Sequence, residues 1–253
     1  KNMKLEVETA SATVTINDTS KPPPFGTEFP AYAPNASDGY TLSELGTPSP
    51  IGTKFIYDNG YIKYTVNGFG EGALGDSSSG TGMMYDPTGN GNFGTDDYIR
   101  PGTPWEGYAV WINSYYIGGS DNGNWADSNF GLPTTIWKVS DEHYVIMKGT
   151  AALGFLVVQY ITFFGEAIVR ICMSYTNTTS STVTLKACRG VDPDVDVYAH
   201  GTYDTNNQRG FGTISPNDLV YSIGTYSNKP LSLFTNGNGY VHNTAVIASW
   251  PTY

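Results

Sequence analysis

The feature that most constrains this chain is a period-two alternation of apolar and polar residues, which dominates its sequence in short segments. Such alternation is typical of β-strands that bury one face. Clusters of Gly, Asn, Asp and Ser separate the segments, for example at 89–97, 118–124 and 235–239. Many short strands with frequent turn signals predict an all-β fold, an antiparallel β-sandwich with few or no helices.

The clearest predicted hairpin covers residues 53–66, where Asp58, Asn59 and Gly60 are residue types that tolerate the positive φ of tight turns. A single helical turn is expected at 41–45. Further strands are expected at 105–117, 135–139, 143–149, 152–163, 166–176, 182–191, 195–203, 219–226, 230–235 and 244–250.

A second hairpin is predicted between residues 169 and 188, folded about 179–181, because its apolar residues then share one face. In that register Cys172 lies directly opposite Cys188, where a cross-strand disulfide is geometrically feasible. The alternative is two unbonded thiols. A disulfide would place the protein in an oxidising compartment.

Composition and three glycosylation sequons also favour an extracellular location. The sequons begin at Asn17, Asn35 and Asn177, all in predicted loops or turns. Only 14% of the residues are charged, and the net charge is −10. The few basic residues are scattered, which argues against nucleic acid and anionic membranes as partners. The longest apolar run, at 151–158, is too short to span a bilayer.

The sequence divides into three parts. Residues 1–20 form an arm that contains a β-competent segment at 4–16, residues 21–34 form a linker with five prolines in fourteen residues, and residues 35–253 form a single sandwich domain. Two readings of the arm stay open. Its strand pairs with its own sheet, or it reaches a neighbouring subunit and extends that subunit's sheet.

The densest group of carboxylates is Asp192, Asp194 and Asp196, which alternate around Pro193. In an extended chain these side chains project to one side and repel one another. Either a calcium ion neutralises them as an oxygen-ligand site, or they pair with an arginine, with Arg189 and Arg209 as candidates, or are solvated. A catalytic role is a third reading of the same cluster.

No motif of an enzyme is apparent. The three histidines lack zinc-ligand spacing, and there is no nucleophile elbow and no phosphate-binding loop. The chain is therefore predicted not to be an enzyme. One alternative pairs Glu106 with His200 as the acid and base of a carbohydrate-active enzyme with a mutarotase-like fold. Another uses the aromatic residues between 105 and 144 as a glycan-binding face, although alternation assigns most of them to the core.

Three stretches, at 101–113, 169–196 and 201–207, resemble in that order a β-sandwich module of large microbial surface and adhesin-like proteins, of a mutarotase-like or supersandwich kind. The resemblance covers roughly the middle half of the chain and implies a secreted structural or adhesive module. It brings no catalytic residues, and calcium at the aspartates would suit it.

Because the module nearly fills the chain, we expect an extracellular structural subunit that self-assembles with identical copies into a filament, sheath or surface layer. The alternatives are a glycan-binding adhesive module and the carbohydrate-active enzyme.

Overall fold

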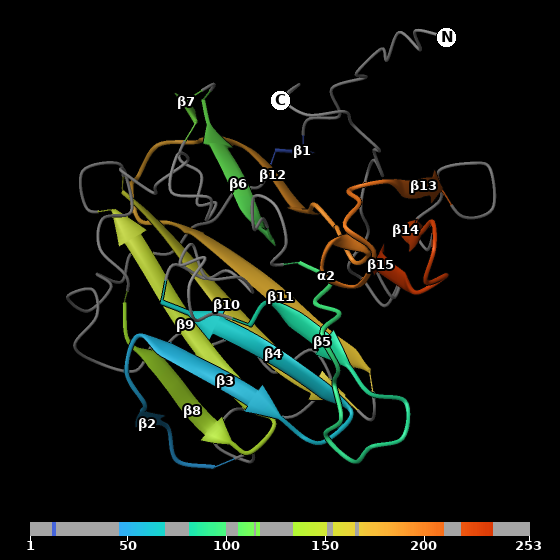
Figure 1. The fold of residues 1–253 in the computed structure, drawn as a ribbon. Coiled ribbons are helices and arrows are strands. Elements are labelled where there is room, and N and C mark those ends of the chain that lie inside the picture. The colour runs from blue at the N-terminus through green and yellow to red at the C-terminus, as the bar shows by residue number, and fades with distance from the viewer. Residues whose placement is uncertain are drawn as a thin grey trace, which may run out of the picture.

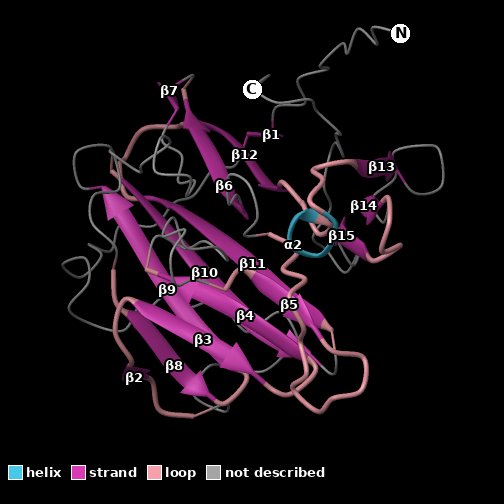
Figure 2. Cartoon of the chain, in the orientation of Figure 1, coloured by secondary structure: helices cyan, strands magenta, loops and turns pink. Residues whose placement is uncertain are grey.

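A computed structural model describes residues 12–13, 46–68, 81–99, 106–113, 115–116, 134–150, 154–164, 167–209 and 219–234. Within these ranges the chain forms four antiparallel sheets and one short helix (Figure 2). The all-β class is therefore confirmed.

The large sheet has five strands in the order β11-β10-β9-β8-β2. The β6–β12 sheet has the order β1-β12-β6-β7, and the β3–β5 and β13–β15 sheets have three strands each in chain order. The bounds of the large sheet are β2 Ser49–Pro50, β8 Ile136–Ser140, β9 His143–Thr150, β10 Phe155–Phe164 and β11 Ile168–Asn177. The other strands are β1 Ala12–Thr13, β3 Lys54–Asp58, β4 Ile62–Asn67, β5 Met83–Tyr85, β6 Glu106–Ile112, β7 Tyr115–Tyr116, β12 Thr184–Val191, β13 Thr205–Arg209, β14 Leu219–Gly224 and β15 Pro230–Phe234.

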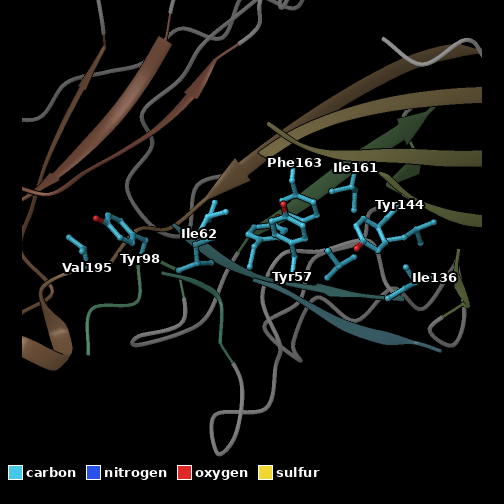
Figure 3. Packing of buried hydrophobic residues seen from close by; sticks show 12 residues of the cluster. Tyr57, Ile62, Tyr98, Ile136, Tyr144, Ile161, Phe163 and Val195 are labelled. Atoms are coloured by element: carbon cyan, nitrogen blue, oxygen red, sulfur yellow. The ribbon is translucent and has the colours of Figure 1, made fainter. Parts of the chain in front are cut away.

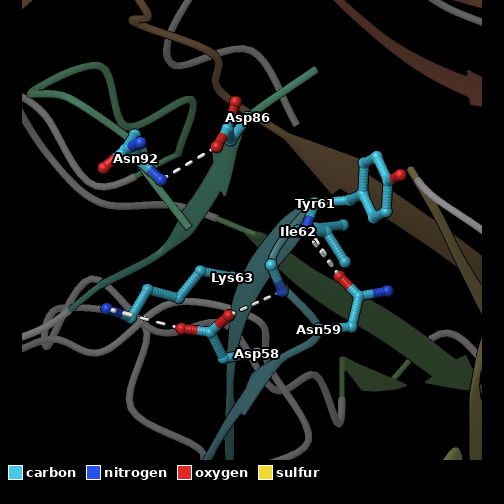
Figure 4. Close-up of polar contacts among 8 residues, drawn as sticks. Asp58, Asn59, Tyr61, Ile62, Lys63, Asp86 and Asn92 are labelled. Carbon is cyan, nitrogen blue, oxygen red and sulfur yellow. Dashed lines mark hydrogen bonds and ion pairs between the residues drawn. The ribbon is translucent and has the colours of Figure 1, made fainter. Parts of the chain in front are cut away.

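The predicted hairpin at 53–66 is confirmed as β3 and β4 (Figure 4). Its turn is fixed by two side chains. Asp58 accepts a hydrogen bond from the Gly60 N–H, and Asn59 accepts from the N–H groups of Tyr61 and Ile62. Gly60 has φ 86°, and a Cβ there would lie 2.5 Å from the Gly89 carbonyl oxygen. The turn therefore requires glycine for both its conformation and its close approach.

Two small sheets cover the same face of the large sheet, one beside the other (Figure 1). Along β10, Ile161 and Phe163 pack against the β3–β5 sheet in one apolar cluster (Figure 3). Phe155 and Val157, on the same side of β10, pack against β6 and β12 in a second cluster. Within the described residues the large sheet is thus one layer of a sandwich, and the two small sheets share the layer on this face. The opposite face of β10 is also buried, at Leu156, Val158 and Tyr160.

The second predicted hairpin is wrong. β11 pairs with β10 and β12 pairs with β6, so the two strands belong to different sheets. Asn177 turns the chain between them, because its side chain accepts from the Thr179 N–H and donates to the Ser181 carbonyl. The inward faces of β11 and β12 then meet across the sandwich, where Tyr175 and Leu185 join one cluster. Apolar alternation correctly predicted that Met173, Tyr175, Val183 and Leu185 share a core, but it could not distinguish this crossing from a hairpin.

The strand expected at 195–203 is also wrong. A short helix, α2, covers Val197–His200 and ends at Gly201, whose φ of 70° is typical of a helix C-cap. The strand that follows is β13, which the sequence did not predict, and β5 was missed as well. The helical turn expected at 41–45, the strand at 244–250 and the proline-rich linker lie outside the described residues.

Candidate functional site

The outer edge of β12 is the first candidate site. β12 lies between β6 and β1, and β6 faces it from Val191 to Leu185. On the other side, β1 faces only its first two residues, with Ala12 opposite Leu185 and Thr13 opposite Thr184. Within the described part of the chain, the remaining backbone of that edge has no strand beside it. Unpaired N–H and C=O groups at a sheet edge are a ready template for another strand.

A buried polar cluster lies directly behind this edge, between the two apolar clusters. The Arg189 guanidinium contacts Glu106 on β6, with Nη2 2.6 Å from Oε1. Its Nη1 donates to Gln159 Oε1 on β10 at 2.9 Å, and the Tyr64 hydroxyl donates to Glu106 Oε2 at 3.2 Å. The side chains of Arg189 and Glu106 are 12% and 8% exposed. Three sheets therefore meet at one ion pair that is largely removed from solvent.

Burial and charge set the protonation states in this cluster. Burial, and then the adjacent Glu106 carboxylate, raises the pKa of Tyr64 well above 10, so the phenol keeps its proton and donates. Burial by itself would lower the pKa of Arg189, but Glu106 and Tyr64 raise it overall. The guanidinium is therefore held as a cation. Its Nε–H is buried and has no hydrogen-bond acceptor among the described residues.

Sequence reasoning missed most of this cluster. It named Arg189 only as a partner for the aspartates, and Glu106 only as an enzymatic acid or base. The available signal was Gln159, a single amide in the apolar run of β10 that is fully buried in the fold. A buried amide requires hydrogen-bond partners, so its position indicates polar neighbours.

The three aspartates of the DPDVD stretch have different environments. Asp196 is 1% exposed, and its carboxylate accepts from the backbone N–H groups of Tyr226 at 2.8 Å and Ser227 at 3.2 Å. Burial alone would raise its pKa, but these hydrogen bonds lower it overall. A Cβ at Gly224 would lie 2.7 Å from Asp196 Oδ1. These contacts attach the turn between β14 and β15, and with it the β13–β15 sheet, to the sandwich.

An ion pair and an apolar contact also hold the β13–β15 sheet in place. Lys229, in the same turn, forms an ion pair with Asp96. Leu231 on β15 packs against the core cluster that contains Val195. The β13–β15 sheet is thus attached by hydrogen bonds, charge and apolar packing together.

Asp192 and Asp194 are not used in this way. Burial, and then the charge of Asp192, raises the pKa of Asp194 to about 7, and burial also raises the pKa of Asp192. The expected alternation of three carboxylates on one side ends at Val195, where the chain turns. Among the described residues no group of three or more His, Cys, Asp or Glu side chains is placed to hold a metal ion. Calcium at Asp192, Asp194 and Asp196 stays a prediction.

An open hollow of about 410 Å³ lies at the hairpin turns of β3–β4 and β8–β9. Its apolar part includes Phe55, which stacks on Tyr144 at 4.5 Å between ring centroids, and Ile56, which is 39% exposed. Its polar lining is Asp58, Asn59, Asp141 and Glu142. No basic residue is among these described lining residues, although Lys63 pairs with Asp58 at 3.8 Å and Lys138 pairs with Asp141 at 2.7 Å. The three carboxylates still favour a ligand that offers hydrogen-bond donors.

The other predicted site residues are placed as follows. Cys172 lies opposite Tyr160 in the large sheet, and Cys188 lies opposite Ala109 in the β6–β12 sheet. The cross-strand register proposed for their disulfide is therefore wrong, and a disulfide between them stays a prediction without that support. The Asn177 amide donates to Ser181 in an exposed turn. Asn17 and Asn35 lie outside the described residues.

The alternative enzymatic pair is engaged elsewhere. Glu106 is bound by Arg189 and Tyr64 in the interior. His200 is exposed at the end of α2 and stacks on Tyr226, with 5.4 Å between ring centroids. Neither arrangement matches an acid and a base that face a common substrate.

Comparison of the chain with protein-family models, curated proteins and solved structures gives no significant match. The resemblance to microbial surface modules therefore stays a prediction. Among the described residues, no helix has the length and apolar character that a membrane crossing needs.

Proposed function

We propose that this chain is an extracellular structural subunit that self-assembles by adding a strand of one copy to the β12 edge of the next. The observation that carries the proposal is the pairing of β1 with β12, because it brings Ala12 and Thr13 beside residues far along the chain. This two-residue pairing within one chain supports the proposal that the same edge takes the equivalent strand of a neighbouring copy. The same edge is exposed at Thr184, Lys186 and Ala187.

The mode of assembly follows from strand exchange. An element that pairs within its own chain makes the same contacts when it pairs with a neighbour, so exchange is a low-cost route to oligomers. Strand and edge are different surfaces, which makes the contact head-to-tail. A head-to-tail contact that does not close into a ring propagates into a filament or layer. The low content of charged residues, 14%, also suits packing against identical copies.

A peptide competition experiment tests this function. We expect light scattering and negative-stain images of the full chain to reveal polymers that grow with protein concentration. A synthetic peptide of residues 4–16 in excess should cap the β12 edge and shorten them. A scrambled peptide of the same composition should have no effect. Monomers at every concentration, or polymers indifferent to the peptide, would refute the proposal.

The hollow favours a second candidate function, a glycan-binding adhesive module. A sugar ring offers hydroxyl donors to the carboxylates and an apolar face to Phe55. We expect neutral oligosaccharides on a glycan array to bind, and Glu142→Ala to weaken that binding by about tenfold, as for the loss of one hydrogen bond to a charged group. Asp204→Ala, a change at an exposed aspartate outside the hollow, is the matched control. An array without binding would remove this candidate.

A further inference from the structure

We infer that the strand added to β12 is residues 6–13 of a neighbouring copy, held in a single register by contact between its Glu8 and Arg189. This inference rests on the proposed function and adds the identity of the incoming segment, its alignment and the contact that selects it.

The alignment follows from the pairing already present. β1 is antiparallel to β12, with Thr13 opposite Thr184 and Ala12 opposite Leu185. Each step back along the first strand is therefore a step forward along β12. Continued in this register, an incoming strand of residues 6–13 matches the full eight residues of β12, with Glu6 opposite Val191. In the exchanged form the neighbour's strand takes over the two pairs that β1 makes.

The segment is suited to such pairing. Residues 6–13 read EVETASAT, with no proline or glycine to interrupt a ladder and with the β-branched residues Val7, Thr9 and Thr13 among them. In the same register Glu8 falls directly opposite Arg189.

The side chain of Arg189 favours the register that places Glu8 opposite it. Its Nη1 and Nη2 already contact Gln159 and Glu106, while its buried Nε–H lacks an acceptor among the described residues. A buried donor without a partner is costly, and a guanidinium carries five N–H groups that bind carboxylates well. Directly opposed residues of an antiparallel pair have their side chains adjacent. A carboxylate at position 8 of the incoming strand is therefore placed to accept from Arg189.

A shift of register removes this match. A one-residue slip turns every side chain of the strand to the other face. A two-residue slip brings Ala10 or Glu6 opposite Arg189, and only Glu6 is acidic. The Glu6 slip leaves Gly190 and Val191, at the other end of the eight-residue edge, without a partner from residues 6–13. The alignment with Glu8 opposite Arg189 combines full coverage with charge complementarity.

Disulfide trapping tests the register, because Thr9 falls opposite Cys188. Opposed Cα atoms in an antiparallel pair lie about 4.5–5.5 Å apart, within the range that a disulfide spans. We expect Thr9→Cys in a Cys172→Ala background to give, after mild oxidation of the polymer, a ladder of linked subunits on a non-reducing gel. Val7→Cys in the same background is the matched control, since it falls opposite Gly190 and should crosslink at least tenfold less.

Neutral substitutions test the contact with Arg189. Glu8→Gln should raise the protein concentration needed for assembly by about tenfold, as for loss of a hydrogen bond to a charged group. Glu6→Gln makes the same change of charge in the same segment and should have little effect.

The outcomes separate the two proposals. If the wild-type chain polymerises but Val7→Cys crosslinks better than Thr9→Cys, or Glu6→Gln and Glu8→Gln act alike, the register is wrong while the assembly function stands. If Thr9→Cys links only within single chains, residues 6–13 belong to their own subunit and the inference is overturned. A wild-type chain that never polymerises overturns the function and the inference with it.

Discussion

Replacing Arg189 by Met is expected to lower the free energy of unfolding by roughly 3–5 kcal/mol, the usual cost of removing one partner of a buried ion pair. The loss leaves Glu106, whose side chain is 8% exposed, as an uncompensated charge between three sheets. It also leaves Gln159, a fully buried residue, without the donor to its carbonyl oxygen. Urea denaturation of the folded monomer measures the change.

A double substitution separates charge from packing. Glu106→Gln together with Arg189→Met removes both charges, and we expect it to recover most of the lost stability, since a buried pair is often replaceable by uncharged residues. Lys229→Met breaks the more exposed ion pair with Asp96 and should cost about 1 kcal/mol or less. If Arg189→Met lowered the free energy of unfolding no more than Lys229→Met, the buried ion pair would not stabilise the contact between the three sheets.

The second large effect concerns pH. The pKa of Asp194 is raised from 3.8 to about 7 in the folded protein, by burial and by the charge of Asp192. Below pH 3.8 the carboxyl is protonated in both the folded and unfolded states, and its contribution to stability is complete. Between that pH and about 7 the unfolded state ionises first, so the contribution is lost as pH rises. We expect the free energy of unfolding to fall by roughly 1–4 kcal/mol across this window.

Asp194→Asn tests the assignment. The variant should have a higher Tm than the wild type at pH 8 and a flatter stability profile between pH 4 and 7, measured with a chelator present. Asp196 and Asp86, whose pKa values are lowered, contribute in the opposite sense, but only as pH falls below about 4. Asp204→Asn is the control, because that aspartate is exposed. If Asp194→Asn left the pH dependence of stability between pH 4 and 7 unchanged, the Asp194 carboxyl would not be its main cause.

Added calcium extends the same experiment. A calcium ion held by Asp192 and Asp194 would neutralise their repulsion, so it should raise the Tm of the wild type at pH 8 more than that of Asp194→Asn. Equal curves with calcium and with chelator would count against the calcium prediction.

The sequence predicted the local features of this chain better than the partners that its strands find in the fold. The hairpin at β3–β4 was predictable because its turn depends on neighbours in sequence: Asp58 and Asn59 bind the next few N–H groups, and Gly60 permits the bend. Most strands of the large sheet were predictable for a similar reason, since alternation reports which side of a strand is buried.

The partner of each strand was not predictable in this way. The inward residues of β11 and β12 are the same whether the strands pair side by side or meet across the sandwich, and only the tertiary structure distinguishes these cases. The expected disulfide register failed because it depended on that choice. α2 replaced a predicted strand because the turn at Val195 and Asp196 is fixed by the distant backbone of Tyr226 and Ser227.

The DPDVD stretch illustrates the division most clearly. The sequence by itself determined only that three carboxylates lie within five residues. The expectation that all three project to one side was wrong, because the chain turns at Val195. The tertiary structure decided how each is treated: backbone N–H groups bind Asp196, while burial favours the protonated form of Asp194. It also decided that Arg189 serves Glu106 and Gln159. Alternation is a property of neighbours in the chain, whereas the partners of a buried charge come from strands far apart in sequence.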